Sequence, residues 1–219
     1  MSKRVLCFGD SNTWGFDPEK QVENSEYSVR LSYEVRWTGR MRKLLGEEYS
    51  VIEEALNGRT SVWDDPVAPF RNGLRYLEPC LHSHEPLDLV IIMIGTNDLK
   101  PRICGRAYDI AEGIECLANC VRAVPCGRFG KTPEILLVSP ISIAKDIAST
   151  PFSDEFGGIA GYEQSLLLPK YIAQKAEALG CHFIDAAQYA DAVIDGVHMD
   201  EANHAKLAAA IAEKVKTII

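Results

Sequence analysis

Residues 87–98 read LDLVIIMIGTND, and this stretch decides the fold. Within it, residues 89–94 are all apolar, and a glycine and three polar residues follow them. A short continuous run of Val, Ile and Leu is typical of a strand buried on both faces, as in a parallel sheet. The polar residues then lie at the carboxyl end of that strand, where open α/β sheets place their binding sites.

Four other stretches are also short, largely apolar and closed by turn-forming residues. They are Val5–Phe8, Tyr49–Glu54, Glu134–Ser139 and Cys181–Asp185. Between these runs, apolar residues recur at helical spacing. The predicted helices cover Tyr33–Leu45, Ala107–Val124, Leu168–Leu179 and Leu207–Ile218. Strands that alternate with helices predict βαβ units and a parallel sheet covered by helices. Residues 58–72 and 141–162 are predicted to be long loops, which are often functional.

Composition sets limits on the class of protein. The chain has 219 residues, 47% of them hydrophobic and 25% charged, which is enough for one domain over 1–219 with a complete core. This excludes disordered, collagen-like and coiled-coil classes. The net charge of −8 disfavours nucleic acid and anionic membranes as partners. No apolar run is long enough for a transmembrane helix, and the first one is too short for a signal peptide.

The cysteines and histidines do not form a metal-binding pattern. Seven cysteines are scattered without a Cys-x-x-Cys pair, so we expect reduced thiols in a cytoplasmic protein. Cys116 and Cys120 are one helical turn apart, but no histidine is placed to complete a zinc site. His82 and His84 are only a pair, and we expect them in a solvated loop or at a helix end. We therefore predict no bound metal.

A serine, a histidine and an aspartate are placed for nucleophilic catalysis. Ser11 follows the first predicted strand, and a serine hydroxyl becomes a good nucleophile only when a base takes its proton. His198 is the candidate base. Asp195 precedes it by three residues, so a single turn brings the carboxylate to Nδ1 of the imidazole.

Attack on an acyl carbonyl also needs hydrogen-bond donors for the oxyanion. The candidates are the backbone N–H groups of Ser11 and Gly58 and the side-chain amide of Asn97, each of which follows a predicted strand. Asn-Gly and Asn-Asp pairs are also ordinary turn sequences. Spacing alone leaves both interpretations open.

Four segments occur in order along the chain: GDSNTWG at 9–15, LNGRTSVWDDP at 56–66, IGTNDLK at 94–100 and DGVHM at 195–199. Together they resemble the sequence blocks of the SGNH hydrolase superfamily, also called the GDSL esterase family. The longer forms of the first three resemble the branch of arylesterases and acyltransferase-type perhydrolases. The resemblance extends over essentially the whole chain, which is identified as a single SGNH hydrolase-like domain over 1–219.

This resemblance implies a fold and a set of roles. The implied fold is a flavodoxin-like three-layer α/β/α sandwich with a five-stranded parallel sheet, and the family needs no cofactor. Ser11 is implied as the nucleophile and Asp195 and His198 as the rest of the triad. The oxyanion hole is implied at Ser11, Gly58 and Asn97.

Two positions depart from the family pattern. Asn12 replaces the leucine of the usual Gly-Asp-Ser-Leu, and Ala55 stands where this branch often has glycine. Neither is a position of the implied chemistry.

The predicted function is a serine esterase that hydrolyses short-chain acyl or aryl esters through an acyl-enzyme, with acyl transfer to other nucleophiles as a further outcome. Two alternatives stay open: a carbohydrate or natural-product O-deacetylase with the same triad, and a noncatalytic flavodoxin-like binding module. The residues predicted to form the substrate pocket adjoin the blocks or lie in the 141–162 segment. They are Asp10, Asn12, Trp14, Phe16, Trp63, Lys100, Phe152, Phe156 and Val197.

The expected partner is a small-molecule ester. Arg59 and Lys100 adjoin block residues and are candidates to meet a polar or acidic substrate group, or are simply solvated. Branch members are often oligomeric. Ile141, Ile143, Ile147 and Phe152 are apolar residues of a predicted loop that could pack against a second copy. A homo-oligomer and a monomer both stay open.

Overall fold

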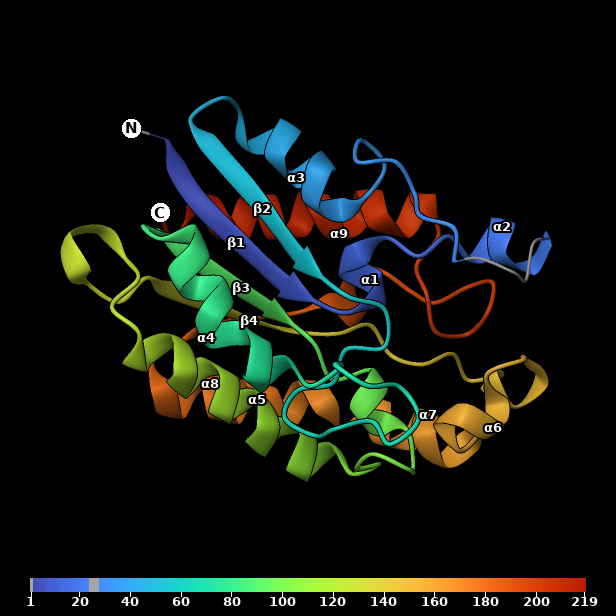
Figure 1. Cartoon of the computed structure of the whole chain (residues 1–219). Helices are drawn as coiled ribbons and strands as arrows, with labels where there is room; N and C mark the ends of the chain where they lie inside the picture. The colour runs from blue at the N-terminus through green and yellow to red at the C-terminus, as the bar shows by residue number, and fades with distance from the viewer. Residues whose placement is uncertain (1, 24–27) are drawn as a thin grey trace.

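Five parallel strands form one sheet, in the order β2-β1-β3-β4-β5 (Figure 1). They are β1 (Lys3–Gly9), β2 (Tyr49–Ala55), β3 (Leu89–Met93), β4 (Glu134–Ser139) and β5 (His182–Asp185). The computed structural model describes residues 2–23 and 28–219. The central strand β3 is buried along its whole length, as its unbroken apolar run predicts. The five predicted strands and their parallel pairing are confirmed.

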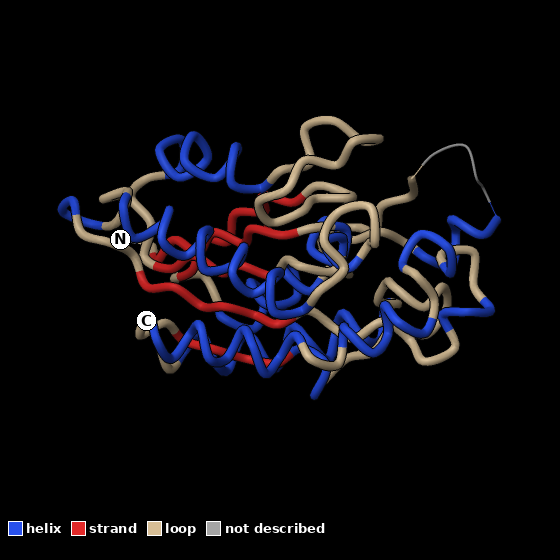
Figure 2. Tube along the Cα trace, turned by 90° about the horizontal axis from the view of Figure 1, so that it is seen from below, coloured by secondary structure: helices blue, strands red, loops and turns tan. Residues whose placement is uncertain are grey.

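Helices cover both faces of this sheet (Figure 1, Figure 2). One face carries α3 (Trp37–Leu45) and α9 (Glu201–Lys216), and the other carries α4 (Gly73–His84), α5 (Ala107–Ala123) and α8 (Leu168–Leu179). Successive strand residues point to opposite faces, so Val5 packs toward α3 and α9 whereas Leu6 packs toward α4 and α5. Two apolar cores result, one on each side of the sheet. The three-layer sandwich and its flavodoxin-like strand order are confirmed.

The ends of the predicted helices follow local chemistry. Pro169 lies in the first turn of α8 and begins the helix without kinking it. Gly180 closes α8 in the left-handed conformation that favours glycine. Asp200 precedes α9 and accepts a hydrogen bond from the N–H of Asn203. The predicted start of α3 at Tyr33 is early, because residues 33–35 form a turn and the helix begins at Trp37.

The structure also contains elements that the sequence does not predict. The longest is α4, whose polar residues and internal Pro79 hide its apolar stripe. Most of the others are single turns. They are α1 (Ser11–Trp14), α2 (Pro18–Glu23), η1 (Asn97–Leu99), η2 (Arg128–Gly130), η3 (Ile147–Ser149), α6 (Ser153–Phe156), α7 (Ile159–Ser165) and η4 (Ala186–Gln188).

Of the two segments predicted to be long loops, one is a loop and the other contains short helices. Residues 58–72 contain only isolated bridges and turns, as expected. The expectation for 141–162 is wrong in part, because this segment contains η3, α6 and the start of α7. Ile141, Ile143 and Ile147 are buried in the cores of their own chain. They therefore offer no surface to a second copy, which corrects the packing expected of them.

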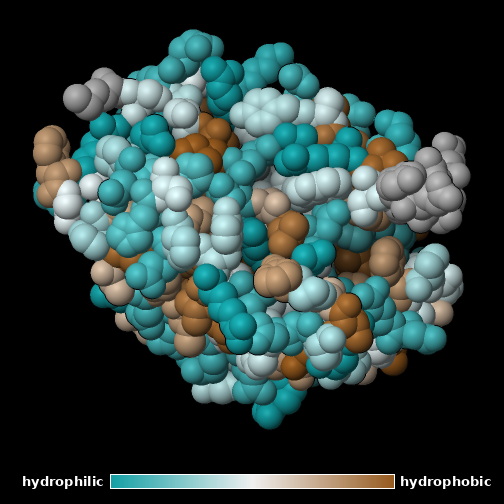
Figure 3. Space-filling view, viewed as in Figure 1, coloured by the Kyte–Doolittle hydropathy of each residue, from teal (hydrophilic) through white to brown (hydrophobic). Residues whose placement is uncertain are grey.

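The surface in view is mostly hydrophilic, with apolar residues scattered among charged and polar ones (Figure 3). Within the described part of the chain, we find no helix with the length and apolar character needed to span a membrane.

Candidate active site

Ser11 lies at the first turn after β1, at the carboxyl edge of the sheet. It is the first residue of α1, and Asp10 caps this short helix by accepting a hydrogen bond from the N–H of Asn12 at 3.0 Å. The turn needs a glycine before it: a Cβ at Gly9 would lie 2.1 Å from Oγ1 of Thr13. The turn therefore fixes the serine hydroxyl next to the end of the sheet.

A relay of hydrogen bonds connects this serine to the C-terminal part of the chain. Nε2 of His198 lies 2.9 Å from Oγ of Ser11, and its Nδ1 lies 2.6 Å from Oδ2 of Asp195. The other oxygen of Asp195 accepts the N–H groups of Val197 and His198 at 2.9 and 2.8 Å. All three side chains of the relay are buried. This is the geometry of an activated nucleophile with an oriented base.

The electrostatics of the relay keep the aspartate ionised. Burial by itself favours the neutral acid at Asp195. The hydrogen bonds from His198 and from the backbone outweigh it and hold the pKa of Asp195 below its ordinary value. A carboxylate at this place can fix the imidazole and support its protonated form.

Three donor groups face the same space as the serine hydroxyl. Ser11, Gly58 and Asn97 line one cavity together with His198. Among the residues that the structure describes, neither the N–H of Ser11 nor that of Gly58 has a hydrogen-bond acceptor. The Nδ2 of Asn97 donates one of its hydrogens to the carbonyl of Arg59 at 3.1 Å, which leaves the second hydrogen available. The three groups can therefore receive an oxyanion.

The cavity in front of the serine has a volume of about 170 Å³ and largely apolar walls. Phe16 stacks on the imidazole of His198 with ring centroids 4.1 Å apart, and Phe152 meets the same imidazole edge-on at 5.7 Å. Five of the predicted pocket residues line this space. They are Phe16, Lys100, Phe152, Phe156 and Val197. The sequence did not single out Ser28, Asn57 and Glu155, which also line it.

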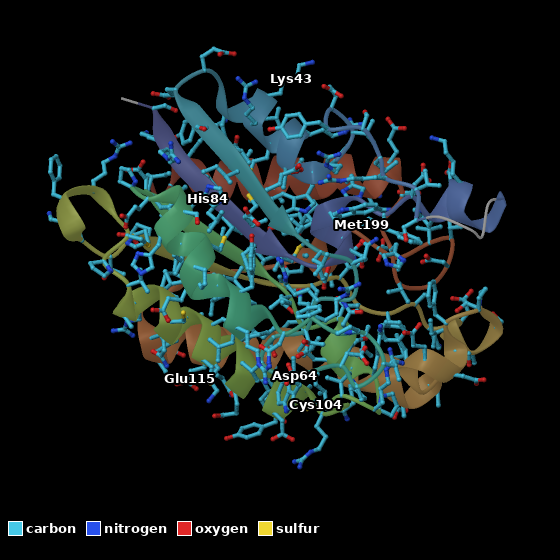
Figure 4. All side chains as sticks on the ribbon, viewed as in Figure 1. Lys43, Asp64, His84, Cys104, Glu115 and Met199 are labelled. Carbon is cyan, nitrogen blue, oxygen red and sulfur yellow. The ribbon has the colours of Figure 1, made fainter. Side chains whose placement is uncertain are left out.

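The structure places two further pocket candidates, Asp10 and Asn12, behind the serine and outside the cavity lining. Asp10 is buried under the turn that it caps. Asn12 connects the serine turn to the histidine loop. Its Nδ2 donates to the carbonyl of Val197 at 3.2 Å, and its Oδ1 accepts the N–H of Met199 at 3.0 Å (Figure 4 labels Met199). Both residues therefore support the site from behind.

The two predicted tryptophans also lie outside the cavity lining. The ring of Trp14 packs against Arg30, whose guanidinium carbon is 5.0 Å from the ring centroid. Trp63 packs on α5, where a Cβ at Gly113 would come within 2.9 Å of its ring. Both rings therefore serve packing, since neither tryptophan lines the cavity in front of Ser11.

Arg59 and Lys100, the two basic residues predicted to meet a polar substrate group, differ in whether they line the cavity. Arg59 is buried and donates to the backbone carbonyls of Gly9 and Glu54 at 3.1 and 2.6 Å, so it joins the ends of β1 and β2. Lys100 lines the cavity, where its Nζ lies 2.8 Å from a carboxylate oxygen of Glu155. Arg59 is thus a structural residue, whereas Lys100 can meet a ligand.

Two buried acids lie beneath the site. Oδ1 of Asp98 accepts the N–H and the hydroxyl of Ser61 at 2.9 and 2.6 Å. Burial raises the pKa of Asp98 and of Asp10 to about 6 each. The sequence singles out neither acid for this role, since their burial depends on how the loops after β1, β2 and β3 meet.

Comparison with known proteins adds independent findings. A model of the GDSL-like lipase/acylhydrolase family matches residues 7–206. An acetylxylan esterase of Xylanibacter ruminicola (strain ATCC 19189 / DSM 19721 / CIP 105475 / JCM 8958 / 23) is 25% identical over 97% of this chain. The chain spans only 43% of the length of that relative.

Solved structures that resemble the whole chain include a carbohydrate acetylesterase and an aryl esterase. A carbohydrate acetylesterase from Sinorhizobium meliloti is 40% identical, with a TM-score of 0.90 and complete coverage of both chains. The native aryl esterase of M. smegmatis is 38% identical, with the same TM-score and the same coverage.

Proposed function

This chain belongs to the GDSL-like lipase/acylhydrolase family, and on that premise we propose that it is a serine esterase with Ser11 as its nucleophile. The observation that carries the proposal is the relay from Asp195 through His198 to Ser11, with contacts of 2.6 and 2.9 Å. A noncatalytic binding module has no chemical need for a buried relay that faces free N–H groups. The whole of 1–219 acts as one SGNH hydrolase domain in this proposal.

The reaction proceeds in two steps. Oγ of Ser11 attacks the ester carbonyl while Nε2 of His198 takes the hydroxyl proton, and the oxyanion is held by the N–H groups of Ser11 and Gly58 and the amide of Asn97. The tetrahedral intermediate then expels the alcohol, which receives its proton from His198. Water next attacks the acyl-enzyme by the same proton transfers and releases the carboxylic acid. An alcohol in place of water gives a new ester, which is the acyl transfer included in the proposal.

The acyl group is short in this proposal. A cavity of about 170 Å³ with Phe152 and Phe156 in its wall has room for an acetyl or similar group. Long-chain acyl groups would need these rings to move. We propose aryl and other short-chain acyl esters as substrates.

A second candidate is the O-deacetylation of a carbohydrate by the same residues. What favours it is that one similar structure is named a carbohydrate acetylesterase and that the similar curated protein is named an acetylxylan esterase. Only the leaving group differs between the two candidates. A panel of acetylated sugars beside aryl acetates therefore separates them.

The first test compares wild type with Ser11→Ala on 4-nitrophenyl acetate, butyrate and octanoate. We expect wild type to prefer the short esters and the variant to lose at least a thousandfold in kcat, because no hydroxyl is left to form the acyl-enzyme. Ser83→Ala, which removes an exposed hydroxyl from α4, serves as the control and keeps full activity. Full turnover by Ser11→Ala would overturn the proposal.

The proposed setting is a reducing compartment such as the cytoplasm. All seven cysteines are free thiols, as is usual where cellular reductants keep them reduced. A homo-oligomer stays a prediction from the family resemblance, and light scattering tests it against the mass of one chain.

A further inference from the structure

A second cluster of reactive side chains lies away from Ser11, between β2 and α4. Its members are Glu54, Cys80 and His84, and one ligand atom from each lies within 4.8 Å of the other two. Figure 4 labels His84 on α4. None of the three residues has a part in the proposed ester chemistry.

Local structure explains why these side chains meet. Cys80 and His84 are four residues apart on α4, so they share one face of the helix. Glu54 is the penultimate residue of β2 and points toward α4. Its Oε1 lies 2.6 Å from Nε2 of His84, and its Oε2 accepts the hydroxyl of Tyr76 at 3.0 Å. The cluster therefore rests on two regular elements and not on a mobile loop.

The thiol in this cluster packs in the apolar core beside α4 but has no polar partner among the described residues. Cys80 is 2% exposed, and its sulfur makes no hydrogen bond within residues 2–23 and 28–219. Buried polar groups usually have partners. A free cysteine can pack as a small apolar residue, but here it faces a carboxylate and an imidazole. This combination of sulfur, nitrogen and oxygen donors is that of a transition-metal site.

We propose that Glu54, Cys80 and His84 bind one divalent metal ion of the zinc class. Zinc accepts thiolate, imidazole and carboxylate ligands together, and a water completes the four-coordinate site. Binding replaces the contact between Glu54 and His84 by bonds from both to the metal. The thiol proton passes to solvent, and no electron is transferred.

Solvent can reach this site. Both Glu54 and His84 are partly exposed, and Glu54 also lines a surface hollow of about 650 Å³ beside Tyr76. Arg59 works against a cation here, because its guanidinium lies over the ring of Tyr76. Hydrogen bonds to two backbone carbonyls fix the guanidinium of Arg59 there. We therefore expect its positive charge to lower the affinity of the site for a metal ion without preventing binding. The metal would tie β2 to α4 and serve structure.

The test is a cobalt titration of the metal-stripped full chain. Thiolate ligation of Co²⁺ gives a sulfur-to-metal charge-transfer band, and added Zn²⁺ should remove that band by displacing the cobalt. We expect one equivalent to bind. Cys80→Ser should abolish the band, and His84→Gln should weaken binding at least tenfold.

Two matched controls address adventitious binding. His82→Gln removes an exposed histidine from the same helix, and Cys116→Ser removes an exposed thiol from α5. Both should bind cobalt as wild type does. The proposal is overturned if wild type gives no band, if the band survives in Cys80→Ser, or if a control variant loses it. Should Cys80→Ser not fold, His84→Gln, at a partly exposed position, decides the question: unweakened cobalt binding by this variant would overturn the site.

Discussion

At the scale of single residues, the candidate site depends on side chains that each make more than one contact. Asp195 holds the imidazole with one oxygen and the backbone of the same loop with the other. The short spacing from Asp195 to His198 made their contact predictable from sequence. Ser11 could be joined to them only by the family resemblance, because 187 residues separate it from His198.

Asn12 shows what spacing does not reveal. The sequence marks it only as a departure from the usual leucine, and both of its partners are backbone groups about 185 residues away. No side-chain pattern could have indicated them. In the structure it keeps the serine turn and the histidine loop in register.

We predict that Asn12→Leu lowers kcat at least tenfold and leaves KM almost unchanged. Leucine cannot accept from Met199 or donate to Val197, so the imidazole shifts relative to Ser11 although the cavity keeps its lining. Steady-state kinetics on 4-nitrophenyl acetate measure the split. Asn119→Ala, at an exposed position of α5, is the control. A kcat within twofold of wild type would show that catalysis does not need the hydrogen bonds of Asn12 to Val197 and Met199.

At the scale of elements, the helices and strands with a regular apolar pattern were predicted correctly, whereas those with an interrupted pattern were missed. The unbroken run of β3 and the apolar stripe of α5 indicate their structures directly. The helix α4 was missed because Pro79, two charged residues and two histidines obscure its pattern. It is held in place by Leu77 and Leu81, which are buried against the sheet. Tertiary packing thus stabilises what local preference disfavours.

The short helix α6 carries one aromatic ring of the cavity, Phe156, and is preceded by another, Phe152. Phe156 is almost fully buried and meets Phe152 edge-on, with ring centroids 6.2 Å apart. Its carboxylate neighbour Glu155 binds Lys100 and also Arg102, at 2.8 and 3.0 Å. These ion pairs fix the helix over the cavity, so the size of the acyl site depends on α6.

We predict that Phe156→Ala shifts the preference of the enzyme toward longer esters. Removing the ring enlarges the acyl site, so the ratio of kcat/KM for butyrate to that for acetate should rise about tenfold. The same change should cost about 3–5 kcal/mol of stability, because it leaves a cavity. Chain-length profiles and urea unfolding measure the two effects. Phe129→Ala, at a fully exposed ring, should change neither, and an unaltered butyrate ratio in Phe156→Ala would exclude this ring as the limit on chain length.

At the scale of the whole molecule, strand alternation predicts two cores but not the acids buried at their common edge. Asp10 and Asp98 lie after β1 and β3, where the loops from three strands close over them. Burial raises the pKa of each to about 6, and the carboxylate of Asp10 adds to the rise at Asp98. In the unfolded chain an aspartate has a pKa of about 3.9. The folded state therefore binds protons more tightly at these two groups.

The sign of the effect on stability follows from this difference. Between about pH 4 and pH 6 these two groups hold more protons in the folded state than in the unfolded chain, so their contribution to the free energy of unfolding falls as the pH rises through this window. Above this window the contribution of the two aspartates is constant. Buried His204 contributes with the opposite sign between about pH 4 and pH 6, because burial lowers its pKa to about 3. Below about pH 4 the free energy of unfolding falls as the pH falls, since hydrogen bonds and ion pairs hold the pKa values of Asp65 and Asp195 below their ordinary value.

We predict that Asp98→Asn reduces the fall in stability between pH 4.5 and pH 8. An amide at this position keeps an acceptor for Ser61 and cannot ionise, so the variant avoids the cost of a buried charge. Relative to wild type it should gain about 2 kcal/mol across this range, because the range starts above the pKa of about 3.9 of the unfolded aspartate and includes only part of the difference of about two units. Urea unfolding at both pH values measures the gain. Asp154→Asn, at an exposed position of α6, should show no such pH-dependent gain. If Asp98→Asn differs from wild type by the same amount at both pH values, Asp98 is ionised at little cost and the raised pKa is wrong.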